Sequence, residues 1–285
     1  MRPDLATAAR RFGHHVTSRT RTFRSLSAAG FRRFATYRQA TIAASFTNSV
    51  FGFLRSFVLL ATIAGAGSAA VGGYNASQLA TYAWVSQGLI GVVLLWGWTD
   101  LADRIRSGDV LADLLRPVHP VVSYLSVDLG RAAYAMLTRF VVPVAVGAVF
   151  FDLYAPRQVA TYPLFALSVL AAVVVSFGCR YLINATAFWL LDLRGVNVLW
   201  LFASTVLSGL LFPLSFLPAW VADALWLFTP YPSVLMTPLE VVVERGPMID
   251  RLALVGLQLV WAGVLLAGCV LVQRRAERRL VIQGG

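Results

Sequence analysis

The stretch LADRIRSGDVLADLLRP, residues 101–117, places charged side chains between two long apolar segments. Read as a helix from Asp109 to Arg116, it has apolar and charged residues on opposite faces. Asp109 is a candidate N-cap, Arg116 suits the C-terminal end, and Pro117 stops the helix. The apolar face holds Val110, Leu111, Leu114 and Leu115, and the charged face holds Asp109, Asp113 and Arg116. Because the segment is too short to cross a bilayer, we expect it to lie flat, where a soluble protein can bind it.

The composition indicates an integral membrane protein. Hydrophobic residues make up 58% of the 285 residues and charged residues only 13%, whereas soluble domains have about a quarter charged residues. A membrane-spanning helix needs about 20 apolar residues. Apolar runs of this length occur at about residues 41–64, 79–98, 132–151, 159–180, 196–217 and 252–272. We therefore predict an all-α, polytopic membrane protein with six transmembrane helices.

The arginines set the expected orientation. All 24 basic residues are arginines. If both termini are cytoplasmic, most of these arginines flank the inner ends of the spans, and the outer loops hold only Arg157, Arg245 and Arg251. The positive-inside rule therefore predicts an even number of spans with both termini in the cytoplasm.

The segment before the first span is strongly basic. We divide the chain into a basic extension (residues 1–26), an interfacial helix (27–40), the transmembrane domain (41–272) and a basic tail (273–285). In the interfacial helix, Phe31 and Phe34 flank Arg32 and Arg33, as in helices that lie at a membrane surface. Anionic lipids, rather than nucleic acid, are therefore the expected partner of this charge. For the residues before 25, a solvated tail that sets the topology is an equally good interpretation.

Two apolar segments do not fit simple spans. Residues 159–191 would form a helix of about 50 Å, longer than the hydrocarbon core of about 30 Å, so we expect a break at Arg180. In residues 207–232, prolines interrupt the fifth span, and the helix that follows, Ala219–Phe228, is too short to cross. We predict a re-entrant hairpin on the outer face that borders a pathway or a subunit interface. An outer loop with apolar anchors is the alternative. The candidate hairpin and pathway residues are Gly209, Phe212, Pro213 and Pro218.

Arg55 is the most unusual charge in a predicted span. It lies near or past the middle of the first span, where a charge costs at least about 2.5–3.5 kcal/mol. Arg139 lies about two turns into the third span and can extend its side chain to the inner surface, and Arg180 lies at the expected boundary of the fourth span, so neither requires a functional role. Our hypothesis is that Arg55 faces a subunit interface or the translocation path, paired with an acid or a lipid phosphate. We expect no clearly buried carboxylate in the spans, which argues against a secondary transporter.

The sequence shows no catalytic or metal-binding motif. A phosphate-binding loop of the Walker A type needs a lysine, and the chain has none. None of the three histidines falls in a predicted span, and neither a His-Glu-x-x-His nor a Gly-x-Ser-x-Gly motif occurs. The acids at the inner interface would suit a metal-dependent lipid-modifying enzyme, although their spacing also fits a solvated helix face. These acids are Asp100, Asp103, Asp109 and Asp113.

With these features the chain resembles the permease subunits of the type-2 ABC transporter family. After the second predicted span it is similar to that family's Ile-x-x-Gly-x-(two or more x)-Leu-Leu-x-Pro run. The residues that this resemblance assigns to ATPase binding are Ile105, Arg106, Gly108, Asp109, Leu111, Leu114, Leu115, Arg116 and Pro117. Gly209, Pro213 and Pro218 resemble the family's Gly-x-x-x-Pro-x-x-x-x-Pro hairpin. The likeness extends over nearly the whole chain from about Phe31.

The resemblance implies a membrane subunit that is not itself catalytic. It points to bacterial exporters in which two non-identical permeases join a separate ATPase dimer, although the residues themselves fit a second permease that is either homologous or identical. ATP and Mg would then bind the partner ATPase, no cofactor would bind this chain, and residues 100–117 would contain a cytoplasmic coupling helix. The location implied is the bacterial inner (plasma) membrane, with multiple passes. A drug, a peptide, a glycolipid or an organic cation would fit the composition equally well as cargo.

Overall fold

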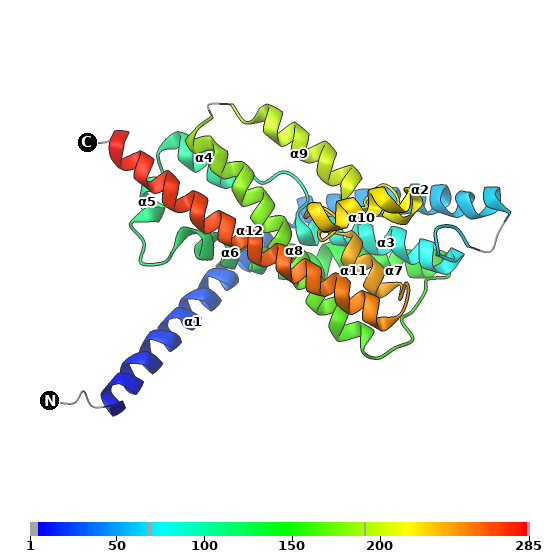
Figure 1. Ribbon diagram of the computed structural model, residues 1–285, viewed down its shortest axis with the longest axis horizontal. Helices are drawn as coiled ribbons and strands as arrows, with labels where there is room; N and C mark the ends of the chain where they lie inside the picture. The colour runs from blue at the N-terminus through cyan, green and yellow to red at the C-terminus, as the bar shows by residue number, and fades with distance from the viewer. Residues whose placement is uncertain (1–4, 68–69, 191, 284–285) are drawn as a thin grey trace.

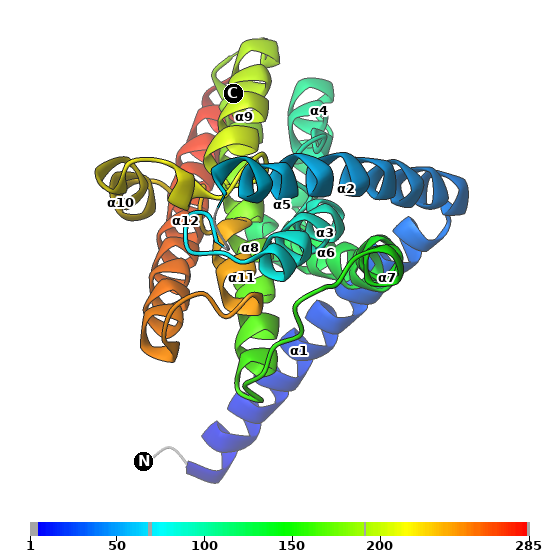
Figure 2. The same cartoon turned by 90° about the vertical axis from the view of Figure 1, so that its right-hand side faces the viewer.

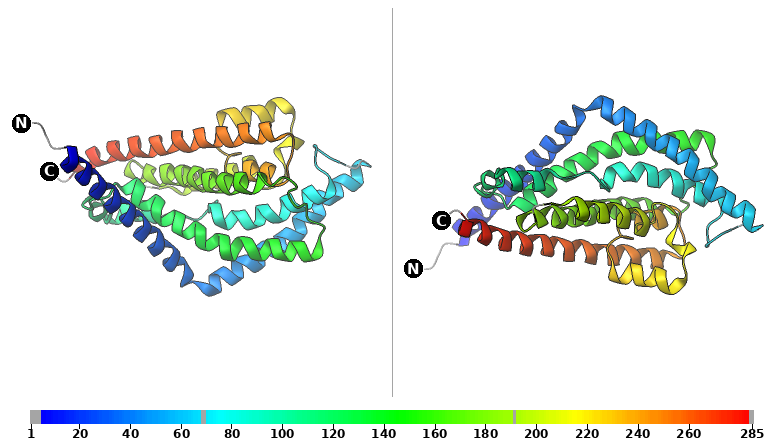
Figure 3. Two further views of the ribbon diagram at one scale, coloured as in Figure 1. Left: turned by 90° about the horizontal axis from the view of Figure 1, so that it is seen from below. Right: turned by 90° about the horizontal axis from the view of Figure 1, so that it is seen from above.

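The computed structural model describes residues 5–67, 70–190 and 192–283, and the elements in these ranges are helices. The predicted all-α, polytopic membrane fold is confirmed. The first four residues of the predicted basic extension and the last two of the predicted tail lie outside the described ranges. The helices form an elongated bundle (Figure 1), and the N- and C-terminal ends both lie toward one end of its long axis (Figure 3).

Four helical segments are long and apolar enough to cross a membrane. They correspond to the first, third, fourth and sixth predicted spans. The third is continuous from Pro120 to Phe150, because a π-helical turn joins its two α-helical parts. The elements are α2 (Arg38–Ala66), α6 (Pro120–Ala135) with the π turn (Met136–Phe140) and α7 (Val141–Phe150), α8 (Thr161–Ala185), and α12 (Met248–Gln283).

The second and fifth predicted spans are shorter helices than their apolar runs suggest. α3 (Ala76–Val93) has 18 residues and starts at a capping box between Asn75 and Gln78. It ends where Leu94 adopts a left-handed conformation, with φ of 51°. α9 (Arg194–Leu207) has 14 residues and ends just before Gly209, whose φ is +81°. The predicted ends at residues 98 and 217 therefore lie beyond the helices.

The predicted break of the fourth span at Arg180 is wrong. α8 continues without interruption to Ala185, and a 3-10 turn (Thr186–Phe188) follows. Arg180 does not need to reach the membrane surface, because Asp128 pairs with its guanidinium at 2.8 Å inside the bundle.

The N-terminal helix α1 (Leu5–Ala35) packs against α6 through two glycines. A Cβ atom on Gly130 would lie 1.8 Å from the carbonyl oxygen of Ser27, and one on Gly30 would lie 2.2 Å from that of Val127. The two backbones therefore approach as closely as only glycine permits. After Ala35 the chain turns sharply into α2 (Figure 3).

The short elements lie toward the two ends of the bundle. Toward the end that holds the termini are α4 (Asp100–Ser107) and α5 (Val110–Leu114) (Figure 1). Toward the other end lie a 3-10 turn (Leu214–Phe216), α10 (Ala219–Phe228) and α11 (Met236–Val242). α10 has the predicted bounds and stands at the edge of the bundle (Figure 2). The core is built mainly from α3, α8 and α11, most of whose residues are buried.

Candidate functional site

The segment of residues 100–117 forms two short helices instead of the predicted single helix from Asp109 to Arg116. α4 ends at Ser107, because Gly108 adopts a left-handed φ of +82°, the usual glycine stop of a helix. α5 covers only Val110–Leu114. Asp109 does not cap α5 with its side chain, because its carboxylate accepts a hydrogen bond of 2.8 Å from the Ser107 hydroxyl.

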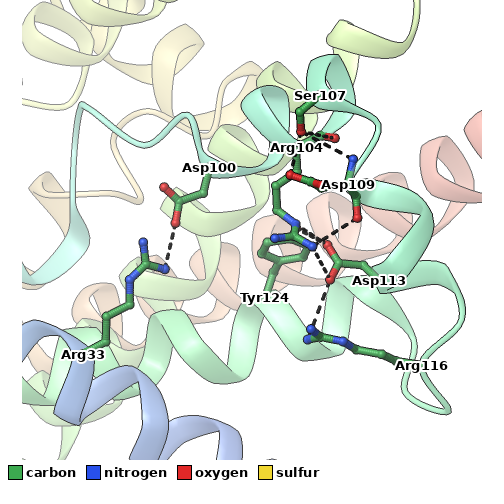
Figure 4. Close-up of polar contacts among 8 residues, drawn as sticks. All are labelled: Arg33, Asp100, Arg104, Ser107, Asp109, Asp113, Arg116 and Tyr124. Atoms are coloured by element: carbon green, nitrogen blue, oxygen red, sulfur yellow. Dashed lines mark hydrogen bonds and ion pairs between the residues drawn. The ribbon is translucent and has the colours of Figure 1, made fainter.

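Asp113 is the centre of a polar network that joins α4, α5 and α6 (Figure 4). Arg104 donates from Nε and Nη2 to the two carboxylate oxygens, at 2.6 and 3.1 Å. The Tyr124 hydroxyl, from α6, donates to the same carboxylate at 2.8 Å. Arg116 adds an ion pair at 3.7 Å. The hydrogen bond to Asp113 raises the pKa of Arg104 above its ordinary value, because it favours the charged guanidinium.

The predicted orientation of this segment is therefore reversed in part. Asp113 was expected on a solvated face, yet it is 8% exposed. Of the predicted apolar face, Val110 is buried, whereas Leu111 and Leu115 are 54% and 88% exposed. The cause is the Asp113 network, which turns the Asp113 side of α5 toward α6 (Figure 4) and leaves Leu111 and Leu115 exposed.

The other residues assigned to ATPase binding fall into two groups. Some belong to the part of the segment that packs against the bundle, which we call the base, and the others form an exposed tip. Ile105 packs against the buried side chains of Leu101 and Val110 in the base. Leu114 is half-buried. The exposed tip consists of Leu111 and Leu115 together with Arg106, Gly108, Asp109, Arg116 and Pro117. We call these seven residues the tip.

Two further contacts attach α4 to the bundle. The Asn184 side chain of α8 accepts a hydrogen bond from the Ala102 amide at 3.1 Å and donates one to the Trp98 carbonyl at 2.9 Å. Arg33 of α1 pairs with Asp100 at 3.0 Å (Figure 4). The base of the segment is thus connected to α1, α6 and α8.

Behind this segment, a buried ion network holds the end of α3. Asp128 pairs with Arg131 at 2.7 Å and with Arg180 at 2.8 Å. Arg131 also donates to the carbonyls of Gly91 and Val92, at 2.7 and 2.8 Å. These carbonyls belong to the last turn of α3, where backbone carbonyls have no hydrogen-bond partner within the helix. The expectations that the spans contain no clearly buried carboxylate and that Arg180 lies at the boundary of its span are therefore wrong.

The predicted hairpin residues lie at the junction of α9, α10 and α11. The Tyr82 hydroxyl donates to the carbonyl of Gly209, and a Cβ on Gly209 would lie 2.8 Å from both Tyr82 and Met236. Pro213 is buried and Phe212 half-buried. Pro218 is exposed and starts α10, accepting hydrogen bonds from the first-turn amides with its carbonyl oxygen.

Arg55 lies in α2 and faces α3. Its Nη1 donates to the Ser86 hydroxyl. Within the described part of the chain, its Nε and Nη2 are buried and have no hydrogen-bond partner, and no acidic side chain forms an ion pair with it. The hypothesis that Arg55 meets an acid or a lipid phosphate outside this chain remains a prediction.

At the opposite end of the bundle, Glu244 ties several elements together. Its carboxylate accepts hydrogen bonds from the Tyr154 hydroxyl at 2.6 Å and from the amides of Arg157 and Gln158, both at 2.9 Å, as well as from the Thr161 hydroxyl. Desolvation by burial opposes ionisation of this carboxyl, but the hydrogen bonds outweigh it and lower the pKa to about 2.

Sequence reasoning missed the roles of Asp128, Arg131 and Tyr124. A signal for the first two was present, because an aspartate and an arginine three residues apart form one face of a helix in an apolar run. Nothing in the sequence pairs Tyr124 with Asp113, because that contact depends on how α5 folds back onto α6.

The fold and this site define a polytopic helical membrane protein with an anchored helical tip at one end of the bundle. A family model described as ABC-2 family transporter protein matches residues 50–284. The chain therefore belongs to the ABC-2 transporter family and is a permease component of an ABC transporter, without a catalytic role of its own. Membership in this family implies that an ABC ATPase is its partner. Comparison with curated proteins and with solved structures gives no match.

Proposed function

We propose that this chain is a permease subunit of a bacterial exporter and that the tip is the surface that its ATPase binds. The observation that carries the proposal is the exposure of Leu111 and Leu115 on a segment that partly buried polar contacts hold in place. Exposed leucines near charged residues, outside the long apolar helices, are typical of protein-binding surfaces. An ATPase cleft that receives α5 would bury both leucines.

The contacts of the base suit it to transmit movement from the tip to the long helices. Within α5, beside Leu111 of the tip, Asp113 connects to Tyr124 of α6, and Ala102 of α4 connects to Asn184 of α8. An ATPase that displaces the tip would therefore displace two long helices. We propose that ATP binding to the partner favours one arrangement of these helices over another, which is a population shift between two conformations.

The remaining features of the proposal concern assembly and location. We propose that a second permease, identical or homologous, completes the translocation pathway, with the hairpin residues around Gly209 at its outer part. ATP and Mg would bind the ATPase dimer, and this chain would lie in the bacterial inner membrane with both termini in the cytoplasm. The position of both chain ends toward the α4–α5 end supports this orientation (Figure 3), as do the arginines along α1, which suit anionic lipids.

The alternative functions have less support. Within the described residues, no group of three or more His, Cys, Asp or Glu side chains could hold a metal ion, as a metal-dependent lipid-modifying enzyme would need. A secondary transporter would use a buried acid as its coupling site. The buried acids Asp128 and Glu240 are instead each paired with arginine.

Affinity purification of the tagged full chain from its native membranes tests the proposal. We expect an ATPase subunit to co-purify with ATP hydrolysis activity, and the double variant Leu111→Asp, Leu115→Asp to lose both. A matched control is Leu190→Asp, because Leu190 is 45% exposed but lies outside the tip. Purification of this chain without any ATPase, or equal ATPase recovery with the double variant, would contradict the proposal.

A further inference from the structure

A cavity of about 250 Å³ lies between the connection from α3 to α4, the second half of α8 and the first turns of α9. Its lining combines aromatic, amide and arginine side chains, an unusual set for the interior of a membrane bundle. The residues that the argument uses are Trp96, Trp98, Arg180, Asn184, Asn197 and Trp200. Two of them carry hydrogen-bond donors that nothing in the described chain satisfies.

The first unsatisfied donor belongs to Arg180, which is 2% exposed. Its Nη2 donates to Asp128 at 2.8 Å, and its Nε has a long hydrogen bond of 3.3 Å to the Ser176 hydroxyl. Its Nη1 is buried and has no acceptor among the described residues. A buried, unpaired donor on a charged group is costly, so an acceptor from outside the chain would stabilise this arrangement.

The charges around the cavity also favour a negatively charged ligand. Asp128 is a single carboxylate that pairs with both Arg131 and Arg180. One positive charge is therefore left without a compensating acid. The Trp98 ring stacks over the Arg180 guanidinium at 5.6 Å, and this contact supplies only part of the missing stabilisation.

The second unsatisfied donor is the Trp96 indole. Its Nε1 is buried and has no acceptor in the described part of the chain. The neighbouring Trp200 differs, because its Nε1 donates to the Leu95 carbonyl at 2.9 Å. Trp96 and Arg180 both line this cavity, and each carries one buried donor that has no acceptor among the described residues. An oxyanion bound in the cavity would accept hydrogen bonds from both once these donors turn toward it.

The exposed side of the cavity is apolar. Val198 and Leu201 of α9 line it and are 50% and 39% exposed, so an alkyl chain can leave the cavity along α9. We infer that this cavity binds the phosphate or carboxylate headgroup of an anionic amphiphile, with the headgroup against Arg180 and Trp96. Taking this ligand as the cargo rests on the proposed transport function, whereas binding itself can be measured without an ATPase.

Binding is tested on the purified full chain in dodecyl maltoside, a neutral detergent. Thermal unfolding is followed against rising concentrations of dodecyl phosphate, dodecyltrimethylammonium or inorganic phosphate. We expect a saturable increase in Tm with dodecyl phosphate alone, since a ligand that binds only the folded state stabilises it. An equal effect of the cationic amphiphile, or of inorganic phosphate at the same concentrations, would overturn the inference.

Matched variants test whether dodecyl phosphate binds in this cavity. Trp96→Phe removes one donor to a charged group and should weaken binding of dodecyl phosphate about tenfold or more. Trp261→Phe is its control, because the Trp261 indole nitrogen also has no acceptor among the residues that the structure describes, and Trp261 lies outside the cavity lining. Arg180→Gln, which removes the charged group from the cavity lining, should abolish binding.

If Arg180→Gln does not fold, the comparison of Trp96→Phe with Trp261→Phe still tests the inference. Equal affinity of Trp96→Phe and Trp261→Phe for dodecyl phosphate would overturn the inference. These results are independent of the ATPase experiment. Loss of the anion site would leave the role of the tip intact, and failure to recover an ATPase would leave the anion site intact.

Discussion

The Tyr124 hydroxyl of α6 donates a 2.8 Å hydrogen bond to Asp113 of α5. This contact joins α5, which carries Leu111 of the tip, directly to a helix long enough to cross the membrane. Arg104 holds the same carboxylate from α4, so the tip has a fixed orientation relative to α6. The proposed transmission of movement depends on this connection.

Removal of the Tyr124 hydroxyl should impair coupling more than assembly. In Tyr124→Phe, Asp113 keeps Arg104 but loses its bond to α6. We expect ATPase binding to persist while transport-dependent ATP hydrolysis falls several-fold, and stability to fall by about 1.5–3 kcal/mol, typical for a hydrogen bond to a charged group. ATPase recovery and hydrolysis are measured on the same preparation. The control is Tyr162→Phe, whose hydroxyl bonds only to an exposed backbone carbonyl at the other end of the bundle. Unchanged hydrolysis in Tyr124→Phe would contradict the transmission path.

The buried network around Asp128 should be essential for folding. Asp128→Asn would leave Arg131 and Arg180 without a counter-charge, and breaking a buried pair in this way costs about 3–5 kcal/mol. We expect a large decrease in Tm in detergent. Asp192→Asn is the control, because the Asp192–Arg194 pair at 3.9 Å is largely exposed and should contribute about 0–1 kcal/mol. Similar Tm values for the two variants would show that the Asp128 network is not stabilising.

The contact of α1 with α6 should depend on Gly130. In Gly130→Ala the new Cβ would lie 1.8 Å from the Ser27 carbonyl, so the helices must separate at a cost of about 1–3 kcal/mol. We expect faster proteolysis of α1 in the variant. Gly263→Ala in α12, where nothing lies within 4 Å of the new Cβ, should be neutral or slightly stabilising. Equal proteolysis rates would contradict the close packing.

The contribution of Glu244 to stability should depend on pH. Its pKa is lowered to about 2 in the folded protein, whereas the ordinary value is about 4.3. A depressed pKa in the folded state stabilises the protein above the unfolded value, and this stabilisation disappears as the pH falls through the folded value. The Tm difference between the wild type and Glu244→Gln should therefore be full near neutral pH and shrink between about pH 5 and pH 3. A constant difference over this range would contradict the hydrogen-bonded carboxylate.

Much of the fold could be predicted because it depends on composition and on local signals. Apolar runs located four long helices, and the prolines around residues 213–232 gave the bounds of α10. The ends of α3 and α8 could not be predicted, because they depend on distant partners. Arg131 satisfies the last carbonyls of α3, and Asp128 lets Arg180 stay inside α8.

The short helical segment in residues 100–117 could be predicted from the sequence, but its orientation could not. Amphipathic spacing identified α5 as a surface segment, and Leu111 and Leu115 are exposed as ATPase binding would require. Spacing alone also placed Asp113 in solvent, because a helical pattern does not show that Arg104 and Tyr124 surround it. Gly108 was the local signal for the break between α4 and α5, since its left-handed φ ends the first helix.

The central claim is that the tip contacts the ATPase, and site-specific crosslinking tests it most directly. The native cysteines Cys179 and Cys269 are both buried, so a cysteine at exposed Leu115 can be labelled selectively with benzophenone maleimide in membranes. We predict a light-dependent crosslink from Leu115→Cys to the ATPase subunit, and none from Leu227→Cys in α10, which is 59% exposed. A crosslink from Leu227→Cys but not from Leu115→Cys, or no ATPase crosslink at all, would contradict the account.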